Sequence, residues 1–240
     1  MRTMCFGRNN HPTNSIPGER RFQILEKKGL RQQKILEVCA LIISHEHRFV
    51  FVQVPQTAST FLGNLFIEKY GGEKILDKHS TYTEFLKVAT EDEKTYAIII
   101  GKRNPMNKAA TRYARRVERR GIEHRNMEEI LNDFEIWFRS RYVDIERNKW
   151  NPHLRRCYSY ADHVISQENL VHDLRATFSA LDLAADDIPP WSETTRKKLD
   201  HYSHYYSDAL VPLALEAFGD EMDQLNYKVP SWCERRLAAE

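Results

Sequence analysis

Three small hydroxylated residues follow an apolar run in the first quarter of the chain. Residues 47–61 read HRFVFVQVPQTASTF, so that Thr57, Ser59 and Thr60 come directly after aromatic and β-branched residues. Where a strand leads into a helix, the first backbone N–H groups of the helix lack intrahelical partners and the helix dipole adds partial positive charge. Phosphate and sulfate bind at such ends. Residues 55–60 therefore predict an anion-binding loop, although a Ser or Thr that caps an ordinary helix gives the same pattern.

A second candidate anion site follows the next apolar run. TYAIIIGKR leads into NPMNKAATRY, which puts Arg103 at the end of a strand and Thr111 in the helix after it. A guanidinium binds phosphate through two parallel hydrogen bonds, and a threonine hydroxyl can add a third. The alternative is an Arg paired with a local carboxylate and a Thr that bonds to its own helix. Two anion sites at neighbouring strand ends suit one ligand that carries two anionic groups.

Both sites require alternating strands and helices. The runs RFVFVQV, TYAIIIGKR and HVISQ have the composition of buried strands. Helical patterns lie between and after them: TFLGNLFIEKYGG, TYTEFLKVA, NKAATRYARRVERR, MEEILNDFEIWFRSRYVDIER, ENLVHDLRATFSAL and SDALVPLALEAFGDEM. The pattern predicts an α/β fold with a central parallel sheet flanked by helices and a helix-rich C-terminal half.

The domain organisation follows from the same pattern. Residues 1–30 mix Arg, Asn, Pro, Gly and Lys without periodicity, so we expect a poorly ordered extension that leads into a helix near 31–40. Residues 31–240 are predicted to form a single α/β domain, since a chain of this length can bury one large core.

Composition excludes several classes of protein and of site. Charged residues make up 29% of the chain and hydrophobic ones 41%, which argues against a fibrous or wholly disordered protein, and the net charge of +2 does not by itself imply a nucleic-acid partner. The four cysteines are far apart, so we expect no zinc or other metal site and no dense disulfide framework. The longest apolar stretch, residues 35–43, is too short to span a membrane, and the N-terminus lacks a secretory signal. A cytoplasmic protein is the simplest interpretation.

The residues around both anion sites resemble a known enzyme family. VPQTASTF, residues 54–61, resembles the 5′-phosphosulfate loop of sulfotransferases that use 3′-phosphoadenosine 5′-phosphosulfate (PAPS), usually VPKTAGTS or VPKTAST in the carbohydrate branch. KRNPMNKAATRY, residues 102–113, resembles the family's 3′-phosphate motif RDPVERLLSAY without a gap. Similarity continues in residues 164–174 and 205–227, so the resemblance covers roughly residues 45–227. The motif set resembles that of the carbohydrate sulfotransferases, in particular the heparan 2-O branch.

The resemblance implies a P-loop-like sheet that binds PAPS in a cleft at the carboxyl ends of its strands, as open α/β folds generally bind ligands. A Walker A sequence is absent from the chain. The family pattern assigns the 3′-phosphate to Arg103 and Thr111. It assigns the 5′ end of the nucleotide to the loop residues Gln56, Thr57, Ala58, Ser59, Thr60 and Phe61.

The implied reaction is an in-line transfer of the sulfuryl group from PAPS to a hydroxyl, or an amine, of a glycan or another small acceptor. His79 is the expected general base, because it resembles the His of GHVSYLDF in the heparan 2-O branch, and Glu84 is the reserve candidate. Gln56 stands where the family has a catalytic Lys, and an amide can donate a hydrogen bond but supplies no charge. The sequence leaves three outcomes open: Lys102, Lys108 or another cation compensates, the enzyme is slow, or the protein binds PAPS without turnover.

Other clusters have weaker interpretations. RYARRVERR, residues 112–120, suits a solvated helix face, a contact with an anionic substrate, or, as a distant alternative, nucleic-acid binding. HYSHYY, residues 201–206, is expected to pack near the C-terminal helix instead of binding a metal. NPHLRR, residues 151–156, is a weak pointer to acceptor contact. The sequence leaves the acceptor and the oligomeric state open.

Overall fold

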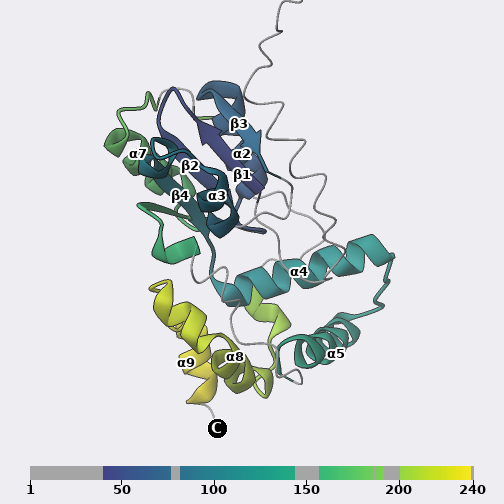
Figure 1. Ribbon diagram of the computed structural model, residues 1–240. Coiled ribbons are helices and arrows are strands. Elements are labelled where there is room, and N and C mark those ends of the chain that lie inside the picture. Colours follow the sequence, from purple (N-terminus) through teal and green to yellow (C-terminus); the bar gives the residue numbers. More distant parts are fainter. Residues whose placement is uncertain (1–39, 77–81, 144–156, 186–187, 192–200, 239–240) are drawn as a thin grey trace, which may run out of the picture. The chain divides into compact units, whose positions relative to one another are not determined.

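The part of the chain that the structure describes contains a five-stranded sheet, which occupies the upper half of Figure 1. In this computed structural model, the described residues are 40–76, 82–143, 157–185, 188–191 and 201–238, and they belong to a unit that runs from Glu37 to Glu240. The strands follow the order β3-β1-β2-β4-β5 across the sheet. Their bounds are β1 (Ala40–Ser44), β2 (Phe49–Gln53), β3 (Gly72–Ile75), β4 (Ala97–Lys102) and β5 (His163–Ser166).

The sheet is mixed, and its parallel half carries both candidate anion sites. Strand β4 pairs in parallel with β2, with Val52 opposite Ile100, and in parallel with β5, with Lys102 opposite Ser166. Strand β1 is antiparallel to both β2 and β3. The carboxyl ends of β2, β4 and β5 therefore meet at one edge, and the segments that follow them are neighbours.

Both faces of the sheet are buried under helices, because the strands are apolar on both sides. One face, with Val52 and Ile100, packs against Tyr82 and Phe85 of α3 (Tyr82–Val88). The other face packs against α2 (Ser59–Lys69) and α7 (Leu170–Ala180). That second core contains, among others, Phe49, Phe51, Ile99, Ile165, Leu62, Phe66, Leu174 and Phe178. A sheet covered in this way is the arrangement that parallel strands require.

The remaining helices build a separate, aromatic core. Helices α4 (Pro105–Arg120), α5 (Met127–Phe138), α8 (Leu210–Gln224) and α9 (Ser231–Leu237) contribute to it. The short turns η2 (Arg139–Val143) and η3 (Tyr202–Tyr205) complete it, and η1 (Glu93–Thr95) precedes β4. Tyr113 packs edge-on against Phe134 at 5.1 Å, and Phe138 against Phe218 at 5.7 Å. Tyr205 and Tyr206 are buried here, so the HYSHYY cluster does pack against the C-terminal helices.

The predicted α/β class is confirmed, and two strands are added to the expected set. The parallel strands β2, β4 and β5 match the predicted runs, whereas β1 and β3 were not predicted and make the sheet mixed. Ala40 starts β1, at the end of the stretch where a helix was expected, and residues 31–39 lie outside the described part. In that described part, every helix is too short or too polar for a transmembrane span.

Candidate functional site

The first candidate site is the turn that connects β2 to α2. Gln56 and Ala58 both adopt left-handed backbone conformations, with φ of 70° and 60°. Side chains other than glycine rarely do so, and alternation of this kind turns successive N–H groups toward one side, as in anion-binding nests. Thr57 is only 1% exposed, and its hydroxyl donates to the Val54 carbonyl at 2.8 Å. Thr57 therefore shapes the turn, while its predicted contact with a phosphate stays a prediction.

The turn packs directly against strand β4 because residue 101 of that strand is a glycine. A Cβ atom on Gly101 would lie 2.5 Å from the Thr57 hydroxyl and 3.0 Å from the Thr57 carbonyl oxygen, closer than packed atoms tolerate. Glycine at position 101 thus lets the β2–α2 turn lie directly on the neighbouring strand. Glycine at position 101 is thus a packing requirement, and it places the first candidate anion site against the strand that leads into the second one.

The N-terminus of α2 is open. Its N-cap is Ala58, which offers no side-chain hydrogen bond, and the first turn contains no acidic residue. The first intrahelical bond runs from the Leu62 N–H to the Ala58 carbonyl, so the N–H groups of Ser59, Thr60 and Phe61 precede it. These donors, together with the helix dipole, are suited to an anion.

Helix α4 begins differently, although it also follows a strand. Its N-cap Asn104 accepts hydrogen bonds from the backbone N–H groups of Met106 and Asn107 at 3.0 and 3.3 Å, and Pro105 has no N–H to offer. Because this helix end satisfies its own donors, anion binding near α4 depends on side chains.

Arg103 is the side chain that joins the two regions. It is 4% exposed, and its Nη1 donates to the Gln56 carbonyl at 3.2 Å while its Nη2 donates to the Asn107 side-chain oxygen at 2.8 Å. Asn107 lies one helical turn, about 5.4 Å, before Thr111 on the same face of α4. The structure thus brings Arg103 to the β2–α2 turn as well as to the face of α4 that carries Thr111.

Two buried polar oxygens at this site have no hydrogen-bond partner among the described residues. They are the hydroxyl of Thr111, a residue that is 9% exposed, and the side-chain oxygen of Gln56. Native proteins pair nearly all buried polar atoms, so such exceptions call for a physical reason. A ligand that completes the site is one such reason.

The two cations considered as substitutes for the missing loop lysine are engaged elsewhere. Lys102 donates to the Leu225 carbonyl at 2.8 Å, and its ammonium lies 5.0 Å from the centre of the Tyr227 ring. Lys108 forms an ion pair with Glu221 at 3.1 Å, and both side chains are nearly buried. To approach Gln56, either ammonium would have to break these contacts. Breaking them would leave a nearly buried charge unpaired, at a high cost in free energy.

Some predicted site residues are not tested by this geometry. His79 and the NPHLRR stretch lie outside the described residues. Glu84 is exposed on α3, which covers one face of the sheet. Within the described ranges, no group of three or more His, Cys, Asp or Glu side chains is arranged to hold a metal ion.

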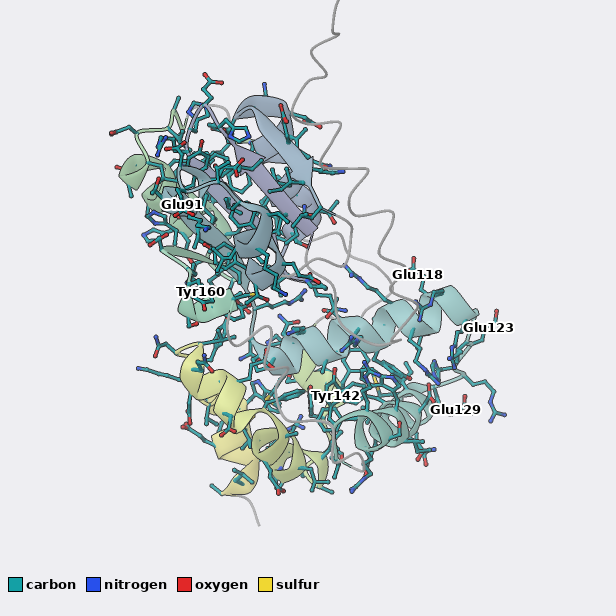
Figure 2. All side chains as sticks on the ribbon, viewed as in Figure 1. Glu91, Glu118, Glu123, Glu129, Tyr142 and Tyr160 are labelled. Carbon is teal, nitrogen blue, oxygen red and sulfur yellow. The ribbon has the colours of Figure 1, made fainter. Side chains whose placement is uncertain are left out.

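The arginine-rich end of α4 carries mixed charges. Arg116 pairs with Asp133 of α5 at 3.1 Å, and Asp133 also accepts a hydrogen bond from the Tyr113 hydroxyl at 2.8 Å. Burial alone would raise the pKa of Asp133, but the bonds from Tyr113 and Arg116 outweigh it and lower that pKa. Figure 2 shows Glu118, Glu123 and Glu129 around the turn between α4 and α5. This end of α4 therefore lies beside acidic residues as well as basic ones, and its contact with an anionic substrate stays a prediction.

Sequence reasoning missed three side chains that shape the site. Asn107 orients Arg103, while Glu168 and Tyr227 lie beside the end of β4. All three fall in stretches whose sequences resemble the family, residues 102–113, 164–174 and 205–227, but the local sequence does not show their contacts. Comparison with family models, with curated proteins and with solved structures finds no match to this chain. The functional assignment therefore depends on the residues themselves.

Proposed function

We propose that this chain is a P-loop-like sulfotransferase that binds PAPS at the carboxyl ends of β2 and β4 and transfers its sulfuryl group to a hydroxyl of a glycan or another small acceptor. The observation that carries the proposal is the hydrogen bond from Arg103 to the Gln56 carbonyl, 3.2 Å long. It joins the two segments whose sequences resemble the 5′ and 3′ phosphate motifs, so one nucleotide with two anionic ends could contact both.

The chain's own groups fit the two ends of such a nucleotide unequally. At the 5′ end, the open N-terminus of α2 offers backbone donors from residues 59–61. At the 3′ end, the Arg103 guanidinium supplies positive charge, and the buried Thr111 hydroxyl supplies a donor. A phosphate at the 3′ end would accept a hydrogen bond from the Thr111 hydroxyl, which has no partner among the described residues.

In the proposed reaction, the acceptor oxygen forms a bond to sulfur as the bond from sulfur to the 5′-phosphate oxygen breaks. The acceptor proton passes to a general base, for which His79 is the proposed residue, and adenosine 3′,5′-bisphosphate leaves with the negative charge. Gln56 can donate a hydrogen bond from its amide to that charge but cannot neutralise it. Loss of one preorganised donor typically costs about 10²–10³ in rate.

A second candidate function is a protein that holds PAPS or its product without turnover. The observation that favours it is the engagement of Lys102 with Leu225 and of Lys108 with Glu221, so that neither of these two lysines takes the place of the missing loop lysine. Binding depends on Arg103, Thr111 and α2, so it persists in either case.

The test combines titration calorimetry with a sulfate-transfer assay. We expect adenosine 3′,5′-bisphosphate to bind the wild type, and Gln56→Lys to raise the rate of sulfate transfer by about 10²–10³ with little change in nucleotide affinity. The control Asn64→Lys adds the same charge on an exposed position of α2 and should leave the rate unchanged. Lack of nucleotide binding by the wild type refutes both functions, and transfer seen only with Gln56→Lys favours the binding protein.

A further inference from the structure

One glutamate beside the candidate nucleotide site accepts hydrogen bonds from three separate segments. Glu168 follows β5, and its carboxylate accepts from the backbone N–H of Asn104, from the Ser166 hydroxyl and from the Tyr227 hydroxyl, each at 2.8 Å. Although Glu168 lies at the surface, three donors fix its side chain, in contrast to the usual solvated glutamate. The carboxylate thus ties the start of α4 and the end of β5 to the segment after α8.

The segment after α8 makes a second contact with the same region. Lys102, the last residue of β4, donates to the Leu225 carbonyl at 2.8 Å and lies 5.0 Å from the centre of the Tyr227 ring. Residues 225–227 are therefore bonded to both neighbours of Arg103 in the chain: directly to Lys102, and through Glu168 to Asn104. The Asn104 backbone is held by Glu168, and the Lys102 backbone is held by its pairing with Ser166 of β5. A backbone held on each side of Arg103 restricts where the Arg103 side chain can point.

Resting on the proposed function, we infer that Glu168 and Tyr227 are positioning residues that hold Arg103 in the orientation needed for the 3′-phosphate. Glu168 acts on the Asn104 N–H, and Tyr227 acts by fixing the Glu168 carboxylate. The 5′ end of the nucleotide is bound by the N–H groups of α2, whereas the Asn104 N–H that bonds to Glu168 lies next to Arg103, so the effect of both residues falls first on the 3′ end. The two residues therefore set the preference for a nucleotide with a 3′-phosphate over one without it.

The experiment measures this preference as the ratio of affinities for adenosine 3′,5′-bisphosphate and for 5′-AMP. We expect Glu168→Ala to lower the ratio by about tenfold, the equivalent of one well-placed hydrogen bond, through weaker binding of the bisphosphate alone. Glu168→Gln keeps an oxygen for the Asn104 N–H, so it should restore most of the ratio. A general loss of stability would not separate the two ligands in this way.

Tyr227→Phe provides a second variant that leaves the ring over Lys102 in place. We expect it to lower the ratio by about threefold, since it removes one donor to Glu168, and it is decisive where Glu168→Ala does not fold. An unchanged ratio in folded Glu168→Ala, or in Tyr227→Phe if the former does not fold, overturns this inference while leaving the proposed function intact. Failure of the wild type to bind the bisphosphate overturns both.

Discussion

Replacement of Thr111 by valine should act in opposite directions on stability and on binding. Thr111 is 9% exposed, and its hydroxyl is buried and has no hydrogen-bond partner among the described residues. A buried polar group left in this state costs about 1–3 kcal/mol. Valine has nearly the same shape and a similar helix propensity but no hydroxyl, so it removes that cost. We expect Thr111→Val to raise the free energy of unfolding of the ligand-free protein by about 1 kcal/mol.

The same change should weaken nucleotide binding. If the hydroxyl donates to the 3′-phosphate, its loss removes a hydrogen bond to a charged group, which is worth about 1.5–3 kcal/mol, or roughly 10- to 100-fold in affinity. The affinity for 5′-AMP should stay the same, because that nucleotide has no 3′-phosphate. Thr111→Ser is the matched control: it keeps the hydroxyl and should retain most of the affinity for the bisphosphate.

Urea unfolding without ligand and calorimetry with the two nucleotides measure both effects on the same samples. If Thr111→Val is less stable than the wild type, the Thr111 hydroxyl forms a hydrogen bond in the ligand-free protein. A variant that is more stable but binds the bisphosphate normally would mean that the hydroxyl does not face the nucleotide. Either result refutes the assignment of Thr111 to the 3′-phosphate.

Two further predictions concern the packing of the loop and the charge pair of α4. Gly101→Ala places a Cβ 2.5 Å from the Thr57 hydroxyl, so it should destabilise the protein by about 1–3 kcal/mol and weaken bisphosphate binding, whereas Gly219→Ala in α8, with open space around it, should stabilise by about 0.5–1 kcal/mol without affecting binding. Thermal melts and calorimetry test this, and normal binding by Gly101→Ala would contradict it. Because the pKa of Asp133 is lowered in the folded state, its stabilising effect is complete above about pH 4 and is lost as the pH falls through the folded value. The difference in unfolding free energy between wild type and Asp133→Asn should therefore shrink as the pH is lowered from about 6 to about 3. A difference that stays constant would argue against a lowered pKa of Asp133 in the folded protein.

The parallel half of the sheet could be predicted because its strands are continuous apolar runs. The isoleucines of β4 and FVFV in β2 are buried on both faces, which leaves one secondary structure compatible with their length and composition. Strand β1 was missed because an apolar run preceded by charged residues is equally compatible with a buried helix. Strand β3 was missed because it begins at Gly72 and two of its four residues, Glu73 and Lys74, are exposed, so it lacks a strand-like pattern.

The candidate site could be predicted where a side chain follows a strand directly or, as Thr111 does, lies on the helix after that strand. Arg103 and residues 55–60 follow β4 and β2, and parallel pairing of these strands brings them together. The role of Gly101 could not be inferred, since it depends on the distance from Thr57, which is far away in the sequence. The role of Tyr227 could not be inferred either, because its contact with Glu168 joins residues that are 59 positions apart. Contacts of this kind depend on tertiary packing and leave no local pattern.

The two ends of the proposed nucleotide meet chemically different surfaces, and this difference explains how binding and catalysis could separate in one site. The 3′ side relies on a fixed guanidinium, on Thr111 and on the contacts around Glu168, all of which are present. The 5′ side relies on backbone donors of α2 and on a turn in which Gln56 has no charge to offer. Affinity is then carried by groups that are intact, whereas the step that develops charge on the leaving phosphate meets an uncharged amide at position 56, where the family has a lysine. A change at Gln56 should therefore alter the rate far more than the affinity.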